Sequence, residues 1–80
     1  MLNNKKIKLI WQFNGKDAQK IADHHLVHLN EYILREEIVV IDRGTELVNE
    51  FFSISFIIID NSLVEKLRAA LKPHKGFIVE

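Results

Sequence analysis

Apolar and polar side chains alternate over residues 6–13, with Ile10 as the one apolar residue among the polar positions. One set of alternate positions holds Ile7, Leu9, Trp11 and Phe13, and the positions between them hold Lys6, Lys8, Ile10 and Gln12. A hydrophobic period of two predicts a β-strand with one buried face. The pair Asn14–Gly15 that follows is a turn signal, and either Asn14 or Asp17 can cap the start of a helix.

The spacing of apolar residues becomes helical over residues 16–37, and no proline or glycine interrupts this segment. At about 100° per residue, a single stripe forms along one side of such a helix. The stripe consists of Ala18, Ile21, Ala22, Leu26, Leu29, Tyr32 and Ile33. We therefore expect an amphipathic helix over residues 16–37 that packs this stripe against the core.

Two β-rich runs follow the helix. IVVI at residues 38–41 predicts a second strand, and FFSISFIII at residues 51–59 predicts a third. Residues 42–50 between them are polar and contain Gly44, so we expect them to form a connection. In the third strand one face holds Phe52, Ile54, Phe56 and Ile58, and the other holds Phe51, Ser53, Ser55, Ile57 and Ile59.

The last third of the chain predicts a second helix and a final strand. Within DNSLVEKLRAALK, Ser62 and Glu65 have the spacing of a capping box, and Pro73 ends the helical pattern. Helical spacing relates Leu63, Leu67, Ala70 and Leu71. GFIVE at residues 76–80 then predicts a short strand.

The resulting element order is β-α-β-β-α-β, and it occupies residues 1–80 as a single domain without linker or repeat. Right-handed crossovers in two β-α-β halves favour one solution, the ferredoxin-like plait of the α+β class. This fold has a four-stranded antiparallel sheet in the order 4-1-3-2 and two helices on one face.

The other face of that sheet is expected to have a mixed character. Around the central first and third strands we expect it to carry Lys6, Lys8, Ile10, Gln12, Phe51, Ser53, Ser55, Ile57 and Ile59. The chain is 48% hydrophobic, a high share for 80 residues, which suggests that a second copy covers this face. A small molecule held there would meet the polar groups of Gln12, Ser53 and Ser55.

In element order and in the chemistry of this face, the whole chain resembles the dimeric α/β-barrel proteins. That group includes small monooxygenases, isomerases and ligand-sensing modules, and the resemblance implies a homodimer whose sheets face each other. The strings LIWQF, HHLVHL and LKPHKG are also similar to a small bacterial family of unknown function. This second resemblance implies no biochemical role.

Charge and composition narrow the range of partners. Eleven basic and eleven acidic residues leave no net charge, and Phe51 is the one aromatic residue expected on the open sheet face. We therefore expect no nucleic-acid partner. No apolar stretch approaches a membrane span, so we expect no membrane partner. The chain has no cysteine, which excludes thiolate metal sites, and the absence of a signal-peptide core predicts a cytoplasmic protein.

The segment DHHLVHL contains three of the four histidines. His24 and His28 are four residues apart on one flank of the predicted helix and could share a metal ion. His25 lies about 100° away, inside the apolar stripe, so it cannot join them on an undistorted helix. A histidine pair needs further ligands, and we expect no metal and no other cofactor.

His25 and His74 are the candidates for acid–base chemistry. A histidine on a core-facing stripe is usually a structural residue with a hydrogen-bond partner, and Tyr32 lies on the same side of the helix. The alternative is an acid–base group whose pKa burial has lowered. Three connections meet at one end of the predicted plait, at residues 14–17, 42–50 and 73–76. They bring Lys16, His74 and Lys75 to the start of the first helix, where these side chains could form an anion site.

These features predict a small homodimeric domain that binds a ligand or a protein partner. One alternative is an enzyme of the dimeric α/β-barrel type that uses His25 or His74 as its acid–base group. The other is a metal-binding protein that uses His24 and His28. No nucleophile–base pair and no cofactor motif supports the enzyme alternative.

Overall fold

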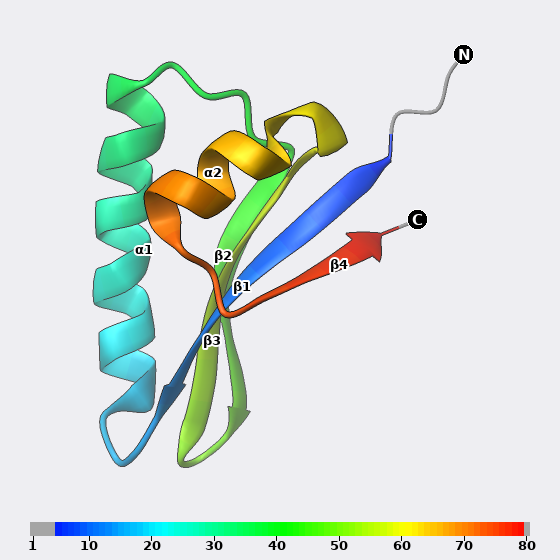
Figure 1. Ribbon diagram of the computed structural model, residues 1–80. Coiled ribbons are helices and arrows are strands. Elements are labelled where there is room, and N and C mark those ends of the chain that lie inside the picture. Colours follow the sequence, from blue (N-terminus) through cyan, green and yellow to red (C-terminus); the bar gives the residue numbers. More distant parts are fainter. Residues whose placement is uncertain (1–4, 80) are drawn as a thin grey trace.

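Four antiparallel strands and two α-helices make up residues 5–79, the part of the chain that the computed structural model describes (Figure 1). In chain order the elements are β1 (Lys6–Asn14), α1 (Ala18–Arg35), β2 (Asp42–Asn49), β3 (Phe52–Asp60), the 3-10 turn η1 (Asn61–Leu63), α2 (Val64–Leu71) and β4 (Lys75–Val79). The protein is therefore of the α+β class, and the element order is the predicted one.

The strand order across the sheet is β2-β3-β1-β4, and all three neighbouring pairs are antiparallel. This is the series 4-1-3-2 counted from the opposite edge, so each strand has the neighbours that the sequence predicts. Strands β1 and β3 are central and pair over nine positions, from Lys6 opposite Asp60 to Asn14 opposite Phe52. The arrangement is consistent with a ferredoxin-like plait.

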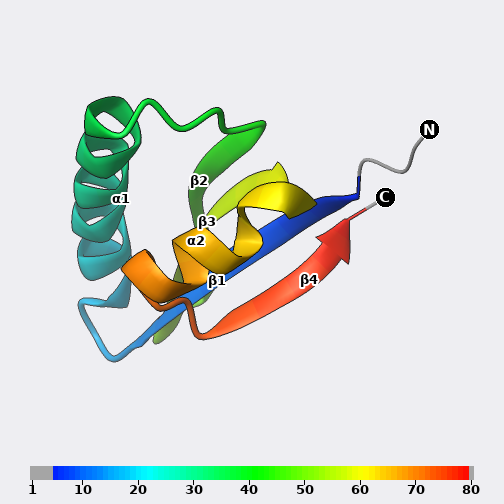
Figure 2. The ribbon, with the colours of Figure 1, turned by 45° about the horizontal axis from the view of Figure 1, so that its top comes forward.

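The core lies between one face of the sheet and both helices, which occupy the same side (Figure 2). It consists of Ile7, Leu9 and Trp11 of β1, Leu29 and Ile33 of α1, Ile57 and Ile59 of β3, and Leu67 of α2. Burial of each such side chain contributes about 1.5–3 kcal/mol. The sheet face covered by the helices is thus the face that Ile7, Leu9 and Trp11 define.

The first strand and first helix confirm the sequence prediction, with ends one to two residues away from those expected. Gly15 between them has φ of +113°, a conformation that favours glycine, and its N–H donates to the Phe51 carbonyl at 2.8 Å. This bond ties the turn after β1 to the turn between β2 and β3. Asp17 occupies the N-cap position of α1 but makes no side-chain capping bond.

The predicted position of the second strand is wrong. Residues 38–41 are irregular, and β2 is instead formed by Asp42–Asn49, the polar segment expected to be a connection. As an edge strand, β2 needs one hydrogen-bonded neighbour and only partial burial, so polar residues are tolerated. Ile38 and Val40 still pack partly against the core, which explains the apolar character of the preceding run.

The two faces of β3 are the reverse of those predicted. Ile57 and Ile59 lie opposite Leu9 and Ile7 and are buried under the helices, whereas Phe56 lies opposite Ile10 on the other face. Both faces of this strand are apolar, so its own pattern does not decide which one is covered. The pairing register with β1 decides it.

The second helix begins differently from the predicted capping box and ends as predicted. The Asp60 carboxylate accepts a hydrogen bond of 2.8 Å from the Ser62 N–H at the 3-10 turn, and Ser62 does not cap α2. Lys72 adopts a left-handed conformation with φ of 49°, and Pro73 follows it. Within residues 5–79 neither helix is long and apolar enough to cross a membrane.

Candidate functional site

All four strands contribute side chains to the sheet face that no helix covers, which we call the open face. From one edge to the other it carries Asp42, Gly44 and Glu46 of β2, Phe52, Ile54, Phe56 and Ile58 of β3, Lys6, Lys8, Ile10 and Gln12 of β1, and Lys75, Phe77 and Val79 of β4. Phe77 is 51% exposed. Phe77 lies on the edge strand β4, whereas Ile10 and Ile54 of the central strands are only 8% and 7% exposed. The exposed apolar area in the middle of the open face therefore comes from the half-buried Phe52, Phe56 and Ile58.

The charges on the open face are separated into two stripes. The β2 stripe is acidic, with Asp42 and Glu46, and the β1–β4 stripe is basic, with Lys6, Lys8 and Lys75. The β3 side chains between them are uncharged from Phe52 to Ile58, and Asp60 at the end of β3 lies opposite Lys6. The face thus has an acidic edge, an apolar centre and a basic side.

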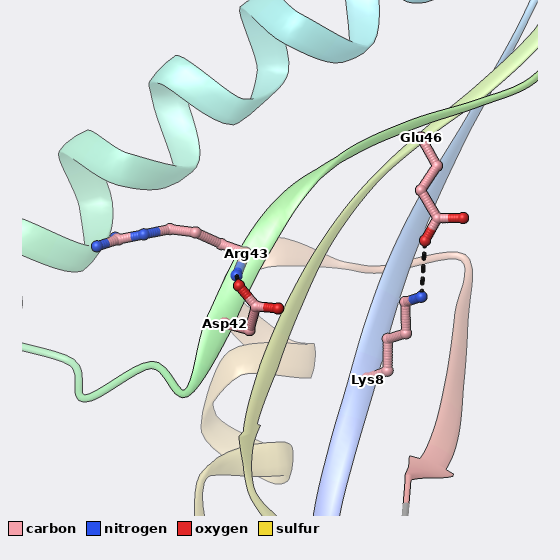
Figure 3. Close-up of polar contacts among 4 residues, drawn as sticks. All are labelled: Lys8, Asp42, Arg43 and Glu46. Atoms are coloured by element: carbon pink, nitrogen blue, oxygen red, sulfur yellow. Dashed lines mark hydrogen bonds and ion pairs between the residues drawn. The ribbon is translucent and has the colours of Figure 1, made fainter.

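One ion pair crosses the apolar centre. Lys8 Nζ lies 2.9 Å from Glu46 Oε1 (Figure 3). The same nitrogen is 4.4 Å from the centre of the Phe56 ring. On the other side of β2, Arg43 reaches toward α1 and donates to Asn30 Oδ1 at 3.0 Å. A partly exposed pair such as Lys8–Glu46 contributes up to about 1 kcal/mol, so its main effect is to hold the Lys8 side chain over Phe56.

The aromatic content of the open face corrects the sequence prediction. Phe51 lies in the turn before β3, while Phe52, Phe56 and Phe77 are on the face. Gln12 and Lys75 are on the face as expected. The balanced charge still argues against nucleic acid, but the scarcity of aromatic residues no longer does.

Ser53 and Ser55 are not on the open face, which is a second correction. Both have no exposed surface and lie under the first half of α1, whose Ala18 and Ala22 are also buried. Small side chains on both elements let the helix approach β3 closely. The serines therefore cannot be polar groups of a ligand site on the open face.

The two buried serines differ in their hydrogen bonding, and this difference predicts opposite mutational effects. Ser55 Oγ lies 2.7 Å from His25 Nδ1, whereas Ser53 Oγ has no partner among residues 5–79. Ser55→Ala should lower the free energy of unfolding by about 1 kcal/mol, because it leaves Nδ1 without its partner. Ser53→Ala should be neutral or stabilising by up to about 1 kcal/mol, since it removes an unsatisfied polar group.

Urea unfolding of the two alanine variants measures this difference directly. Each variant removes one hydroxyl from the same strand and the same face, so each serves as the control for the other. Equal destabilisation by both changes would show that the His25–Ser55 bond does not distinguish these positions.

His25 is held between two aromatic rings and the sheet. Its ring centre is 5.1 Å from that of Trp11 and 5.3 Å from that of Phe13, and its Nδ1 bonds Ser55. Burial lowers the pKa of His25 below its ordinary value of 6.5, and the charges of His28 and then His74 lower it further. The predicted core-facing position is confirmed, and its partner is Ser55 of β3 rather than Tyr32.

The lowered pKa of His25 makes stability depend on pH. Because the folded pKa lies below 6.5, the unfolded chain binds more protons between the two values. The contribution of His25 is therefore complete above pH 6.5 and is lost as the pH falls through 6.5 toward the folded pKa. His25→Gln should reduce the loss of stability between about pH 7.5 and about pH 5.5.

Urea unfolding of the wild type and His25→Gln across that range checks this expectation. The other three histidines are present in both proteins, so the difference between the two profiles isolates His25. Parallel profiles would contradict a lowered pKa at this position.

The geometry gives His25 and His74 structural bonds. The Ser55 hydroxyl beside His25 is fully buried, so it does not face solvent as a nucleophile would. His74 Nδ1 accepts a 2.7 Å hydrogen bond from the Gln12 N–H, and the His74 N–H donates to the Ile10 carbonyl. These bonds attach the start of β4 to β1, and acid–base chemistry at either histidine stays a prediction.

His24 and His28 form a pair on the exposed flank of α1. Their Nε2 atoms are 3.0 Å apart, and Glu31 Oε1 lies 3.1 Å from His28 Nδ1. Across residues 5–79, no group of three or more histidine, aspartate or glutamate side chains could hold a metal ion. The pair is therefore at most two ligands of a site, as the helical spacing implies.

The predicted anion site at the start of α1 is not assembled. Lys16 lies in the turn after β1, whereas Lys75 is opposite Ile10, five residues before Gly15. At about 3.3 Å per residue, the turn that holds Lys16 and the position of Lys75 are about 17 Å apart along β1. The turn that does meet the β1–α1 turn is the one between β2 and β3.

The acidic stripe of β2 is the part of the open face that sequence reasoning missed. A signal for it exists in Asn49, whose Oδ1 accepts a 2.9 Å hydrogen bond from the Phe51 N–H. An asparagine that makes this bond favours a tight turn. A tight turn directly before β3 implies that the preceding residues, including Glu46, form its partner strand.

Comparisons of the chain with protein-family models, with curated proteins and with solved structures found no match. A functional assignment therefore depends on the geometry of the open face and of the helix-covered side. The open face is the most extensive of the sites described above.

Proposed function

We propose that the protein is a small homodimeric binding domain whose two copies associate through their open faces and which takes up a ligand or a protein partner. The observation that carries this proposal is the striping of the open face, with an apolar centre between an acidic edge and a basic side. Helices cover the opposite face, so a ferredoxin-like plait of this kind leaves one sheet surface for a second copy.

A two-fold axis parallel to the strands makes the open face complementary to itself. This axis reverses the strand order between the two sheets, so an axis at the middle of the face places β2 of one copy over β4 of the other and β3 over β1. Asp42 and Glu46 then lie over the edge that carries Lys75 of the second copy, while the β3 side chains lie over its β1. Charge complementarity of this type fixes the register of an interface.

The size of the open face suits a stable dimer. Four strands at about 4.8 Å spacing are about 19 Å across, and nine residues at about 3.3 Å extend about 30 Å. With the relief of its side chains, such a face approaches the roughly 800 Å² per partner of a standard interface. Phe56 and Phe77 supply the aromatic content typical of interface centres.

The absence of cysteine makes a direct test of the covered face possible, because one introduced cysteine is the only thiol. Gln12→Cys places it on the open face, and Lys20→Cys places it on exposed α1 as the matched control. Maleimide labelling of Gln12→Cys should slow at least about tenfold when the concentration rises into the dimer range. Labelling of Lys20→Cys should not change, and equal behaviour of both thiols would contradict the proposal.

Single-stranded nucleic acid is the second candidate occupant of the open face. Phe52, Phe56 and Phe77 could stack with bases, and Lys6 and Lys75 could contact phosphates. The acidic stripe of β2 opposes this function. Fluorescence anisotropy with a labelled oligonucleotide discriminates the two: the dimer proposal expects no saturable binding at about 0.15 M salt, and salt-sensitive saturable binding would favour the nucleic-acid function.

A further inference from the structure

A groove of about 370 Å³ lies between α2 and β4, on the side of the sheet that carries the helices. Its apolar lining includes Ile7, Leu9, Val64 and Ile78, with Gly76 at the sheet side and Arg68 on the helix. The open-face dimer leaves this groove accessible, since Ile7, Gly76 and Ile78 belong to the opposite sheet face. Its volume is near the lower end for small-molecule sites.

Gly76 forms this groove by lacking a side chain. Gly15 has a positive φ that favours glycine, and a Cβ at Gly44 would lie 3.3 Å from the Phe56 ring, which would have to move slightly. Gly76 has neither reason: its φ is ordinary, and a Cβ would meet Leu9 Cδ2 at 3.4 Å, an ordinary contact. A glycine inside a strand weakens it, so its presence is typical of a site where a ligand approaches the backbone closely.

The charge around the groove is entirely basic. Arg68, His74 and Lys75 contribute to its lining, and no acidic residue does. Within residues 5–79, Arg68 makes no ion pair, so its guanidinium is available to a ligand. The pairing register places the Lys75 side chain on the open face, which leaves Arg68 and His74 as the groups that reach into the groove.

His74 presents a hydrogen-bond donor because of its bond to β1. Its Nδ1 accepts from the Gln12 N–H, so the ring proton of neutral His74 is on Nε2. An Nε2–H group and a guanidinium that both line an otherwise apolar groove match the anionic oxygens of an apolar molecule with a single acidic head group.

We propose that this groove binds a small amphipathic monocarboxylate, with its carboxylate at Arg68 and His74 and its apolar tail along Ile7 and Ile78 over Gly76. The inference rests on the proposed function as a binding domain and names the chemical class of its ligand. It does not depend on the open face, so the groove and the dimer are tested separately.

Octanoate, octanol and octylamine are the probes for this site, because they share a tail and differ in the head group. Octanoate should cause saturable shifts of the Arg68, Gly76 and Ile78 amide resonances, with a dissociation constant on the order of 0.1–1 mM. Octanol should bind at least about tenfold more weakly, and octylamine more weakly still. Equal binding of octanoate and octylamine would overturn the proposal.

Two variants locate the head group and the tail. Arg68→Gln should weaken octanoate binding at least about tenfold, while Lys66→Gln removes the same charge from exposed α2 and should leave binding unchanged. Gly76→Val, which suits a strand, should fill the groove and also weaken binding at least about tenfold. Gly76→Ala adds one methyl group and should have a smaller effect.

Thermal unfolding and sedimentation of each variant separate the possible failures. A Gly76→Val protein that folds, dimerises and still binds octanoate as the wild type does would overturn the groove proposal alone. A monomeric wild type that binds octanoate in the groove would contradict the open-face dimer and leave the ligand site standing.

Discussion

Phe56→Glu is expected to convert the dimer into monomers, with the dissociation constant raised about 100-fold or more. Phe56 lies on β3 at the apolar centre of the open face, where the two-fold arrangement places it over β1 of the second copy. The change removes an aromatic anchor from the interface and introduces a carboxylate there, and Lys8, the basic group beside position 56, is already paired with Glu46. Sedimentation velocity at matched concentrations measures the effect.

Leu34→Glu is the matched control for this change. Leu34 is 78% exposed on α1, far from the open face, and receives the same new charge. Leu34→Glu should leave the dissociation constant unchanged, and circular dichroism should show both variants folded. If Leu34→Glu dissociates the dimer and Phe56→Glu does not, the interface lies on α1 and not on the sheet.

Leu67→Ala is expected to cost about 2–5 kcal/mol of the free energy of unfolding. Leu67 has no exposed surface and is the one residue of α2 that is fully enclosed in the core cluster. Because small domains are stable by only about 5–15 kcal/mol, this loss is a large share of the total. The same change should loosen α2 and weaken octanoate binding in the groove beside it.

Urea unfolding measures the effect, with Lys66→Ala as the control. Lys66 is the exposed neighbour of Leu67, and its replacement by a good helix former should change stability by less than about 0.5 kcal/mol. A loss below about 1 kcal/mol for Leu67→Ala would show that α2 is not anchored to the sheet by this side chain.

The first half of the fold could be predicted from the sequence because its hydrophobic periods are unambiguous. Residues 6–13 have a period of two and residues 16–37 a helical spacing, and both elements form where these patterns place them. The second strand could not be placed in this way. Its residues are polar because β2 is an edge strand, and the apolar run at residues 38–41 serves the core without pairing as a strand.

The orientation of β3 could not be predicted because both of its faces are apolar. Register with β1 buries Ile57 and Ile59, and the same register carries Ser53 and Ser55 under α1. A shift of one residue in this pairing exchanges the two faces, and no local pattern fixes it. The predicted ligand role of the serines on the open face depended on this choice.

The candidate site residues follow the same rule: relations within one helix could be predicted from the sequence, and relations between elements could not. Helical spacing correctly places His25 on the buried stripe and pairs His24 with His28. The hydrogen-bond partner of His25 is Ser55, thirty residues away in the sequence. The groove likewise combines Arg68 of α2 with Gly76 of β4. Such combinations depend on the tertiary arrangement, which residue spacing does not specify.

Sedimentation equilibrium of the wild-type protein tests the central proposal most directly. The chain has a mass of 9.4 kDa. Over micromolar concentrations at about 0.15 M salt, a standard-sized interface predicts that a species of twice this mass predominates. The Phe56→Glu variant should sediment with the mass of the monomer. A wild-type protein that sediments at 9.4 kDa throughout this range would contradict association through the open face.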